Sequence, residues 1–372
     1  MPAEILTPDS ESIAQAAAAL LRGDVVGMPT ETVYGLAGCV FQESALAKIF
    51  SVKERPTFDP LICHVAQDES DHRPWLPRLA ELGLVDVAAL SELAQQRITA
   101  LTAAFWPGPL TLVLPKLPAV PDLATSGLPT VAVRCPRHRV AQALLRAVGE
   151  PLAAPSANRF GRISPTSASH VRDELGERIS LILDGGDCEV GIESTVLLVE
   201  PAGAVWHLRP GGVSPAMILE RTSISVERPT TADHAGGTAV PSPGLLASHY
   251  APRKPLRFLP RPLSSMPPAA VAQLAQALPP GTGLGFLAAQ GSTDNLERQF
   301  HGLVNSAGEP LRVVIESLSS QGDLFEAAHR LFAALRGLDD DLHVTELWAE
   351  PVGDDGGLGY AINDRLRRAS HR

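Results

Sequence analysis

Lys53 and Arg55 are the first candidates for chemistry, because two cations two residues apart at the end of a predicted helix can reach the same anion. Lysine offers a compact point charge, and arginine offers a planar fork that binds a phosphate or carboxylate through two hydrogen bonds. The structural alternative is that both cations cap the helix and interact with its dipole. Only four lysines occur in the chain, and the remaining basic residues are arginines.

Further polar groups occur where short apolar runs end, which is where α/β proteins usually bind ligands. These groups are Thr32, Thr111, Arg134, Ser156, Asn158, Ser194 and Arg209. A structural role explains each of them alone at least as well as a functional role, and His64 by itself is most simply a core histidine. Their recurrence between residues 29 and 213 favours one shared site.

Alternating helix and strand patterns surround these groups. Apolar periodicity and capping residues predict helices at 9–23, 43–53, 86–104, 138–148 and 167–176. Short apolar runs, several of them bounded by glycine or proline, predict strands at 24–29, 60–65, 110–114, 130–133, 180–183 and 194–199. The fold class is therefore α/β, with a mixed and largely buried sheet.

The chain is long enough for two or three domains, with 372 residues of which 45% are hydrophobic. Residues 222–252 are rich in Thr, Ser, Pro and Gly, which is typical of a linker. After them, helices and strands alternate again and predict a small Rossmann-like or flavodoxin-like domain. We therefore expect a catalytic domain at 1–214, a linker at 215–254 and a C-terminal domain at 255–372.

The net charge of −10 disfavours a general nucleic-acid binder, which needs a basic face. Residues 1–252 carry 19 basic and 27 acidic side chains, whereas residues 253–372 carry 12 and 14. The acidic excess thus lies mainly in the N-terminal part, and we expect no tight direct nucleic-acid binding. Any phosphate recognition has to be local.

Several other classes of protein are disfavoured by missing motifs. The four cysteines form no CxxC pair, which disfavours a structural zinc site or a disulfide framework. The N-terminus lacks a signal-peptide pattern, and no apolar run approaches the length of a membrane span. We therefore expect a soluble, cytoplasmic protein. The glycines at 281, 283 and 285 precede a predicted strand, so they do not form a dinucleotide-binding turn.

Seven motifs with these polar groups occur in one order: PTETVYGL (29–36), KERP (53–56), PLICHV (60–65), WPGPLTLVL (106–114), PSAN (155–158), GIESTV (191–196) and LRPGG (208–212). Together they closely resemble the YrdC-type threonylcarbamoyl-adenylate synthases. The KxR…SxN signature of that family is met by Lys53, Arg55, Ser156 and Asn158. SPGLLASHYAP (242–252), LFAALRGLD (331–339) and GLGYAINDRLRRA (357–369) resemble the linker and C-terminal domain of its longer, two-domain members.

The resemblance implies a YrdC-like twisted mixed sheet with a central cleft, plus a smaller Rossmann-like domain. It also implies that L-threonine, bicarbonate and ATP, with Mg²⁺ accompanying ATP, give threonylcarbamoyl-AMP, pyrophosphate and water. No protein side chain is expected to bind the metal directly. A separate transferase then carries the threonylcarbamoyl group to the tRNA adenosine next to the anticodon.

The same resemblance gives roles to individual residues. Lys53 and Arg55 would be catalytic, and the threonine site would be lined by Thr32, His64, Ala154 and Ser194. The ATP site would be formed by Arg55, Asp59, Thr111, Arg134, Ser156, Asn158, Ser164, Arg209 and Tyr250. Tyr250, with His249, would come from the linker, so that residues 240–252 act as a lid over the cleft.

Two residues depart from the family pattern. Glu54 stands where many members have glycine, and we expect its side chain to point to solvent. Asp59 lies in FDPL where many members have DNPL. A carboxylate near ATP would repel phosphate unless it meets Mg²⁺ or the ribose, so the role of Asp59 is open.

Two alternative functions share this fold. The first is a carbamoyltransferase-type YrdC enzyme as in hydrogenase maturation, although such chains carry zinc-finger-like regions and this chain has no CxxC pair. The second is an RNA-binding or ribosome-associated module. The acidic balance of residues 1–252 disfavours broad RNA affinity, which depends on the number of neutralised phosphates.

Overall fold

The computed structural model describes residues 2–68, 70–228, 248–354 and 356–371. The chain divides into two compact units. The first unit comprises Met1–Phe160 and Ser164–Leu246, and the second comprises Gly161–Ile163 and Ala247–Arg372. The two-domain prediction therefore agrees with the structure in outline, while the boundaries differ.

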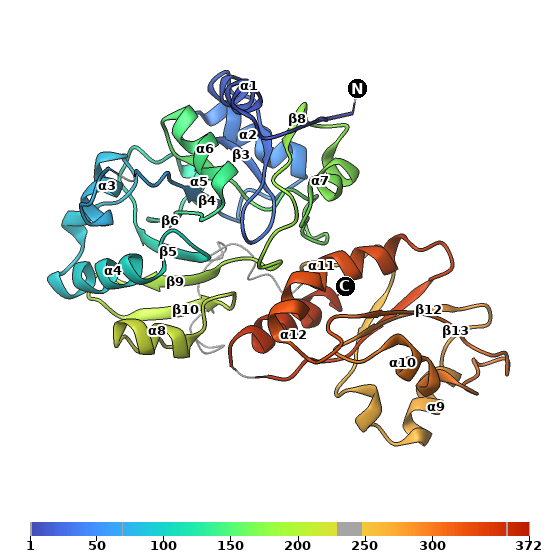
Figure 1. The fold of residues 1–372 in the computed structure, drawn as a ribbon. Coiled ribbons are helices and arrows are strands. Elements are labelled where there is room, and N and C mark those ends of the chain that lie inside the picture. Colours follow the sequence, from blue (N-terminus) through green and yellow to red (C-terminus); the bar gives the residue numbers. More distant parts are fainter. Residues whose placement is uncertain (1, 69, 229–247, 355, 372) are drawn as a thin grey trace. The chain divides into compact units, whose positions relative to one another are not determined.

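Over the described residues, the first unit is built on a ten-stranded mixed sheet with the order β1-β8-β2-β3-β7-β4-β6-β5-β9-β10 (Figure 1). Its strands are β1 (Glu4–Leu6), β2 (Val26–Met28), β3 (Gly35–Cys39), β4 (Ile62–His64), β5 (Leu110–Pro115), β6 (Thr130–Arg134), β7 (Leu152–Ala153), β8 (Leu181–Leu183), β9 (Thr195–Val199) and β10 (Val205–Arg209). The pairs β4–β6 and β5–β9 are parallel, whereas β5–β6 and β9–β10 are antiparallel. The predicted mixed sheet is thereby confirmed.

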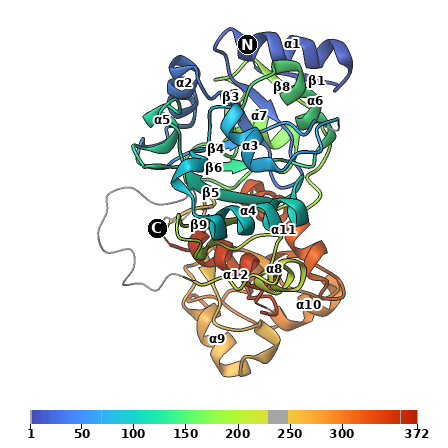
Figure 2. The ribbon, with the colours of Figure 1, turned by 90° about the vertical axis from the view of Figure 1, so that its left-hand side faces the viewer.

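Helices cover both faces of this sheet. They are α1 (Ser10–Leu21), α2 (Glu43–Lys53), α3 (Trp75–Glu81), α4 (Glu92–Phe105), α5 (Asp122–Thr125), α6 (Arg139–Val148), α7 (Ala168–Leu175) and α8 (Pro215–Thr222), with a 3-10 turn η1 at Val87–Ala89. Helices α1 and α6 pack side by side and share one core with strand residues such as Ala37 (Figure 2). Helices α2, α4 and α7 share the other core, which includes Leu36. Successive residues of β3 thus point to opposite faces, as the strand period requires.

Two predicted boundaries were wrong because capping residues interrupt the apolar pattern. The helix predicted at 86–104 begins at Glu92, because Asp86 caps the 3-10 turn and Ser91 caps α4. The predicted linker at 215–254 begins too early, because its first residues form α8. Ser214 accepts a hydrogen bond from the Met217 amide, and the buried Ile218 anchors the helix.

The second unit contains a parallel sheet with the order β11-β14-β12-β13 in its described part. Its strands are β11 (Leu256–Phe258), β12 (Gly283–Ala288), β13 (Arg312–Ser317) and β14 (Glu346–Ala349). Its helices are α9 (Pro268–Gln276), α10 (Thr293–Phe300), α11 (Leu324–Asp340) and α12 (Leu358–Ala369), with a 3-10 turn η2 at Leu263–Ser265. This alternation agrees with the small Rossmann-like domain that the sequence predicts.

The glycines of β12 are required by packing. A Cβ at Gly283 would lie 1.6 Å from the His343 carbonyl oxygen, and one at Gly285 would lie 2.6 Å from Leu347. Both glycines lie inside the strand, so the prediction that they do not form a dinucleotide-binding turn is confirmed. Among the described residues, no helix has the length and apolar character to cross a membrane.

Candidate functional site

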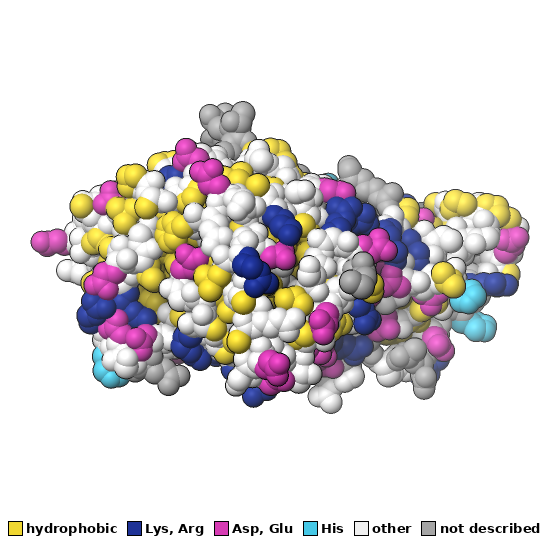
Figure 3. All heavy atoms as spheres, turned by 90° about the horizontal axis from the view of Figure 1, so that it is seen from above, with side chains coloured by type: hydrophobic (Ala, Val, Ile, Leu, Met, Phe, Trp, Pro, Cys, Tyr) yellow, Lys and Arg dark blue, Asp and Glu magenta, His cyan; other side chains and the backbone are white. Residues whose placement is uncertain are grey.

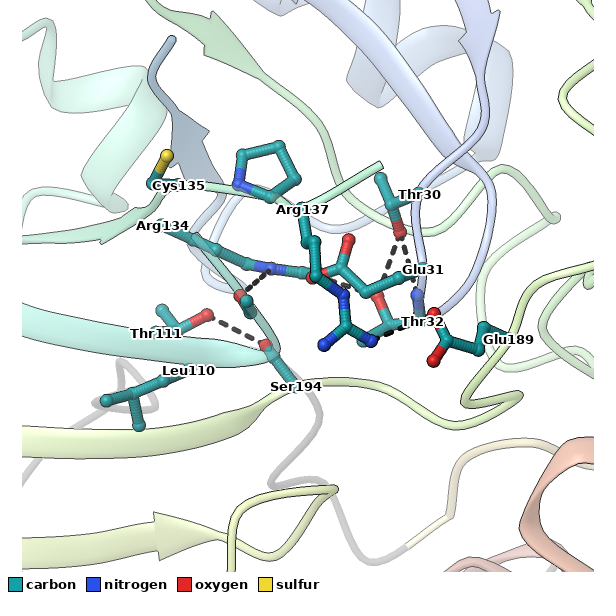
Figure 4. A network of polar contacts seen from close by, with 12 residues as sticks. Thr30, Glu31, Thr32, Leu110, Thr111, Arg134, Cys135, Arg137, Glu189 and Ser194 are labelled. Carbon is teal, nitrogen blue, oxygen red and sulfur yellow. Dashed lines mark hydrogen bonds and ion pairs between the residues drawn. The ribbon is translucent and has the colours of Figure 1, made fainter. Parts of the chain in front are cut away.

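Arg134, at the end of β6, is the centre of a buried polar network in the first unit (Figure 4). One guanidinium nitrogen lies 2.6 Å from Glu31 Oε1, and another donates a hydrogen bond of 2.8 Å to Thr32 Oγ1. The side chains of Arg134 and Glu31 are 4% and 2% exposed. Burial raises the pKa of Glu31, but the charge of Arg134 and its hydrogen bond outweigh burial and hold that pKa below its ordinary value. Glu31 is therefore ionised at neutral pH.

The network continues from Arg134 through two hydroxyls that follow β2. Thr30 donates its proton to the Val33 carbonyl oxygen at 2.6 Å, so the 2.9 Å contact between Thr30 and Thr32 is donated by Thr32. The Thr32 hydroxyl is thus fixed in orientation, because it accepts from Arg134 and donates to Thr30.

Ser194 joins three strand ends on the neighbouring part of the sheet. Its hydroxyl lies 2.8 Å from Thr111 Oγ1 of β5 and accepts a hydrogen bond of 3.1 Å from Arg209 of β10. Arg209 also donates through Nε to the Ser194 carbonyl oxygen at 3.1 Å. The parallel register of Leu110 with Thr195 brings the hydroxyls together. The structure thus unites Thr111, Ser194 and Arg209, which the sequence places far apart.

Lys53 ends α2 and is buried, with 1% of its surface exposed. Its ammonium donates to the carbonyl oxygens of Ser156, at 2.5 Å, and of Asn158. Burial and the neighbouring Arg55 charge hold the pKa of Lys53 well below its ordinary value. The two halves of the KxR…SxN signature therefore meet, with Lys53 fixing the backbone of the SxN loop. Contact of Lys53 with a phosphate stays a prediction.

Arg55 forms a buried ion pair with Asp59, with 2.9 Å between Nη2 and Oδ2. It also donates to the carbonyl oxygens of Asp59, at 3.0 Å, and Pro60, at 2.8 Å. Burial raises the pKa of Asp59, against the opposing charges of Arg55, Lys53 and Arg209. The carboxylate that would repel phosphate is thus balanced by Arg55.

Glu54 points to solvent, as predicted. Its side chain is 59% exposed and lies 2.6 Å from Arg178. Glu54 adopts a left-handed conformation with φ of 54° and ends α2. This turn separates the directions of Lys53 and Glu54, so the extra negative charge faces away from the buried cations.

His64 and Ala154 lie in the middle of the sheet. His64 is opposite Arg134 in the parallel pairing of β4 with β6, and Ala154 donates its amide to the Ile62 carbonyl oxygen at 2.9 Å. Burial, followed by the charge of Arg134, lowers the pKa of His64 to about 3. The imidazole is therefore neutral at pH 7, and its Nδ1 lies 3.1 Å from the Ile62 carbonyl oxygen.

The remaining predicted nucleotide contacts divide between the two units. The buried Ser164 donates to Glu193 at 2.5 Å, and the Asn158 amide donates to the Arg159 carbonyl oxygen at 2.7 Å, both in the first unit. Tyr250 belongs to the second unit, where its ring stacks on Phe332 with centroids 5.5 Å apart. Residues 240–247 of the predicted lid lie outside the described residues. The lid stays a prediction.

The Sua5–YciO–YrdC family model, described as telomere recombination, matches residues 18–211. The model of the threonylcarbamoyl-AMP synthase C-terminal domain matches residues 213–371. The chain belongs to the Sua5–YciO–YrdC family. It is similar to the threonylcarbamoyl-AMP synthase of Pyrococcus abyssi, with 35% identity over 95% of this chain and 93% of the relative.

Further relatives of this family support the same assignment. The threonylcarbamoyl-AMP synthase of Bacillus subtilis is 35% identical over 98% of this chain and 94% of its own length. The crystal structure of P. abyssi Sua5 complexed with L-threonine matches with a TM-score of 0.81 and 33% identity, covering 99% of this chain and 97% of that one. The resemblance seen in the motifs and the YrdC-like fold are thereby confirmed.

Two carboxylates of this Sua5-family site were not predicted from the sequence. Glu31 pairs with Arg134, and Glu193 accepts the Ser164 hydroxyl. No local signal reveals the first pair, because the fold alone brings its partners together. The pairing of Arg55 with Asp59 also lacks a sequence signal, because both residues follow the end of α2 and the i,i+4 rule applies only within a helix. In the part of the chain that the structure describes, no group of three or more His, Cys, Asp or Glu residues is placed to hold a metal ion.

Proposed function

We propose that this protein is a threonylcarbamoyl-AMP synthase that converts L-threonine, bicarbonate and ATP into threonylcarbamoyl-AMP, pyrophosphate and water. The observation that carries this function is the similarity to the P. abyssi enzyme over nearly the full length of both chains. The product supplies the threonylcarbamoyladenosine modification of tRNA. The buried cations and hydroxyls of the first unit suit the two anionic substrates, bicarbonate and ATP, and the carboxylate of threonine.

The reaction requires two bond-forming steps. The neutral amine of threonine forms a nitrogen–carbon bond with the bicarbonate carbon. A carbon–oxygen bond of bicarbonate breaks, and the leaving hydroxide takes up one amine proton and departs as water, which gives a carbamate. A carbamate oxygen then bonds to the α-phosphorus, and the bond from this phosphorus to the leaving oxygen breaks, which releases pyrophosphate. Neither step needs a covalent bond to the protein, so catalysis rests on positioning and on neutralising charge.

The cations of the first unit would promote the second step, in which the carbamate oxygen bonds to the α-phosphorus. Lys53, Arg55 and Arg209 neutralise the phosphates and the reacting carbamate, with Arg134 in support. The contacts of Lys53 support this assignment, because its ammonium lies against the backbone of the SxN loop and Arg55 follows two residues later in the chain. Burial strengthens their effect, since the surrounding medium screens charge less than water does.

The hydroxyls and small residues orient the substrates. Thr32, His64, Ala154 and Ser194 would line the threonine site, in which the neutral imidazole leaves the threonine amine without a competing charge. The contacts to the nucleotide would come from Asp59, Thr111, Ser156, Asn158, Ser164 and Tyr250. The fixed Thr32 and Ser194 hydroxyls support selection of a polar side chain, because their hydrogen bonds are already aligned.

We propose that Mg²⁺ enters as part of MgATP. Among the described residues, no group of carboxylates and histidines is placed as a cage of protein ligands, and Asp59 is already paired with Arg55. Such an ion is held mainly by phosphate oxygens, as is usual for nucleotide substrates. A separate transferase would then use the mixed anhydride to modify tRNA.

Mass spectrometry of the reaction products tests the proposed function. The purified protein is incubated with MgATP, ¹³C-bicarbonate and one amino acid at a time. We expect a labelled threonylcarbamoyl-AMP and one pyrophosphate per adduct with threonine, in the absence of tRNA. ATP hydrolysis without the labelled adduct would contradict the proposal, and comparison of serine with threonine measures selectivity.

The RNA-binding alternative is less well supported. On the face in Figure 3, basic side chains are interspersed with acidic and apolar ones. Broad RNA affinity requires many neutralised phosphates along a continuous basic surface. Tight, salt-dependent RNA binding without adduct formation would favour this alternative over the synthase.

A further inference from the structure

The second unit contains an open cavity of about 790 Å³ that its own loops line. The lining residues follow each of the four parallel strands and include the first turns of α10 and α11. All of them belong to residues 262–354. The cavity is therefore a feature of the second unit alone, independent of the residues assigned to catalysis.

The cavity lies where open α/β sheets bind ligands. Strand β12 pairs with β13 on one side and with β14 on the other, and all these pairs are parallel. The chain runs from β12 through α10 to β13 and then returns through α11 to β14, so the strand order reverses at β12. The crevice outside the carboxyl ends of the strands at such a reversal is the general ligand position of this architecture. Residues 289–291 and 350–354, which follow β12 and β14, line the cavity at this point.

Glu350 ties three of the lining loops together. Its carboxylate accepts the amide of Ala289 after β12, at 2.9 Å, and the amide of Leu263 after β11, at 2.7 Å. The residue is 5% exposed, and burial raises the pKa of its carboxyl group. Each carboxylate oxygen keeps a second lone pair for another donor. Glu350 is thus a fixed acceptor in the wall of the cavity.

Two further buried polar residues hold the rim. Ser319, after β13, accepts the amide of Asp323 at 2.9 Å, and its carbonyl oxygen accepts the amide of Gly291 at 3.0 Å. Asn363 of α12 makes two hydrogen bonds of 3.0 Å with the backbone of Val352. The loops are therefore fixed in place before any ligand binds, which lowers the entropy lost on binding.

The lining has a distinct chemistry. Its charged side chains are the carboxylates of Glu350 and Asp354, and its other polar side chains are mainly carboxamides, including Gln290, Gln299 and Gln321. The described residues that line it include no lysine, arginine, histidine or aromatic residue. Phosphate and carboxylate ligands would find no cationic side chain here, and the two carboxylates oppose the attraction that the N-termini of α10 and α11 exert on an anion. A nucleobase would lack a stacking partner.

We propose that this cavity binds a small organic cation whose ammonium group pairs with Glu350 and Asp354 and whose other polar groups bond to the carboxamides. A cation balances the two carboxylates, whereas a neutral ligand leaves them uncompensated and an anion is repelled. The second unit is then a ligand-binding module attached to the synthase domain.

Calorimetry with three four-carbon probes tests this proposal on the full-length protein: 1,4-diaminobutane, 1,4-butanediol and succinate. We expect the diamine to bind at one site and the diol and the dianion not to bind. Glu350→Gln should weaken diamine binding by about tenfold or more, since it removes a charge-assisted contact. Asp354→Asn should weaken it several-fold. Glu297→Gln, which removes the same charge from α10 outside the cavity lining, should change nothing.

Each outcome decides the proposal. Absence of diamine binding up to about 10 mM, equal binding of the diol, or binding of succinate at the cavity overturns it. Equal diamine affinity in Asp354→Asn, Glu297→Gln and the wild type also overturns it. Asp354→Asn keeps the test valid if Glu350→Gln loosens the loops, because Asp354 is exposed and accepts one amide, that of Gly356 at 2.9 Å.

Discussion

The two units differ in the charge of the residues that lie near the ends of their strands. In the first unit, buried cations lie at strand ends and just after helix α2, and two of them, Arg134 and Arg55, have buried carboxylate partners. In the second unit, the loops after the strands line an open cavity whose charged lining residues are both acidic. Strand ends thus supply a rigid frame, and the residues placed there decide which ligand the frame accepts.

The way each charge is held also differs. Glu31 and Asp59 are held by arginine side chains, whereas Glu350 is held by two backbone amides. An arginine partner keeps a neighbouring site suitable for anions, while amide partners leave the carboxylate charge uncancelled. The net charge of each part of the chain does not show this difference between the two sites. The more acidic part, residues 1–252, contains the cationic site.

The largest effect that this comparison predicts is the loss of Lys53. Lys53→Met removes the charge and both hydrogen bonds to the SxN loop while keeping most of the side-chain volume. We expect kcat for threonine-dependent pyrophosphate release to fall by about 100-fold or more. Lys48→Met removes the same charge from an exposed ion pair on the same helix and is the matched control. An equal fall in kcat in both variants would show that the net charge of the protein, and not the buried position of Lys53, determines the rate.

The second prediction concerns the buried ion pair of the first unit. Glu31→Gln leaves the Arg134 guanidinium buried without a counter-charge, and we expect the free energy of unfolding to fall by about 3–5 kcal/mol in urea denaturation. Glu54→Gln removes a carboxylate from an exposed ion pair and should leave the free energy of unfolding nearly unchanged. A similarly small loss for Glu31→Gln would mean that the pair is not needed to hold the strand ends.

The third prediction separates substrate binding from catalysis. Ser194→Ala removes the hydroxyl that joins Thr111 and Arg209. We expect KM for threonine to rise by about tenfold, with a smaller change in kcat, because one buried hydrogen-bond partner is lost. Ser169→Ala, on the exposed side of α7, is the control. A change in KM for ATP alone would move Ser194 from the threonine site to the nucleotide site.

Elements with continuous apolar runs are predictable from the sequence, as β5 and β9 show. Strand β3 is not, because its sequence GLAGC has the glycines of a loop. The structure explains them: a Cβ at Gly35 would lie 3.0 Å from Ala154, and one at Gly38 would lie 3.1 Å from Ile49. Close packing against α2 and β7 therefore removes the very side chains that would reveal the strand.

The candidate site shows a similar division. The individual cations and hydroxyls are visible in the sequence because they interrupt apolar runs. Their pairing is not, because Thr32 and Arg134 are 102 residues apart and meet only through the strand order. The acidic cavity of the second unit is not predictable either, since its carboxamides and carboxylates resemble ordinary loop residues before the sheet brings them together.

The smallest predicted effect is the pH dependence caused by His64. Its pKa is about 3 in the folded protein, because of burial and then Arg134, against 6.5 for an ordinary histidine. Between these values the unfolded chain takes up a proton that the folded protein does not. Stability is therefore full above pH 6.5 and falls as the pH decreases, by up to about 1.4 kcal/mol per pH unit.

Urea denaturation of the wild type and His64→Asn between pH 7.5 and pH 5 measures this effect. The free energy of unfolding of His64→Asn should not contain the pH dependence that His64 causes in the wild type. The free energies of unfolding of the two proteins should therefore converge as the pH falls. His343→Asn, at an exposed position of the second unit, is the matched control. Parallel curves for the wild type and His64→Asn would mean that the imidazole of the first unit is not kept neutral by its buried position beside Arg134, and the contrast between the units would then rest on the ion pairs alone.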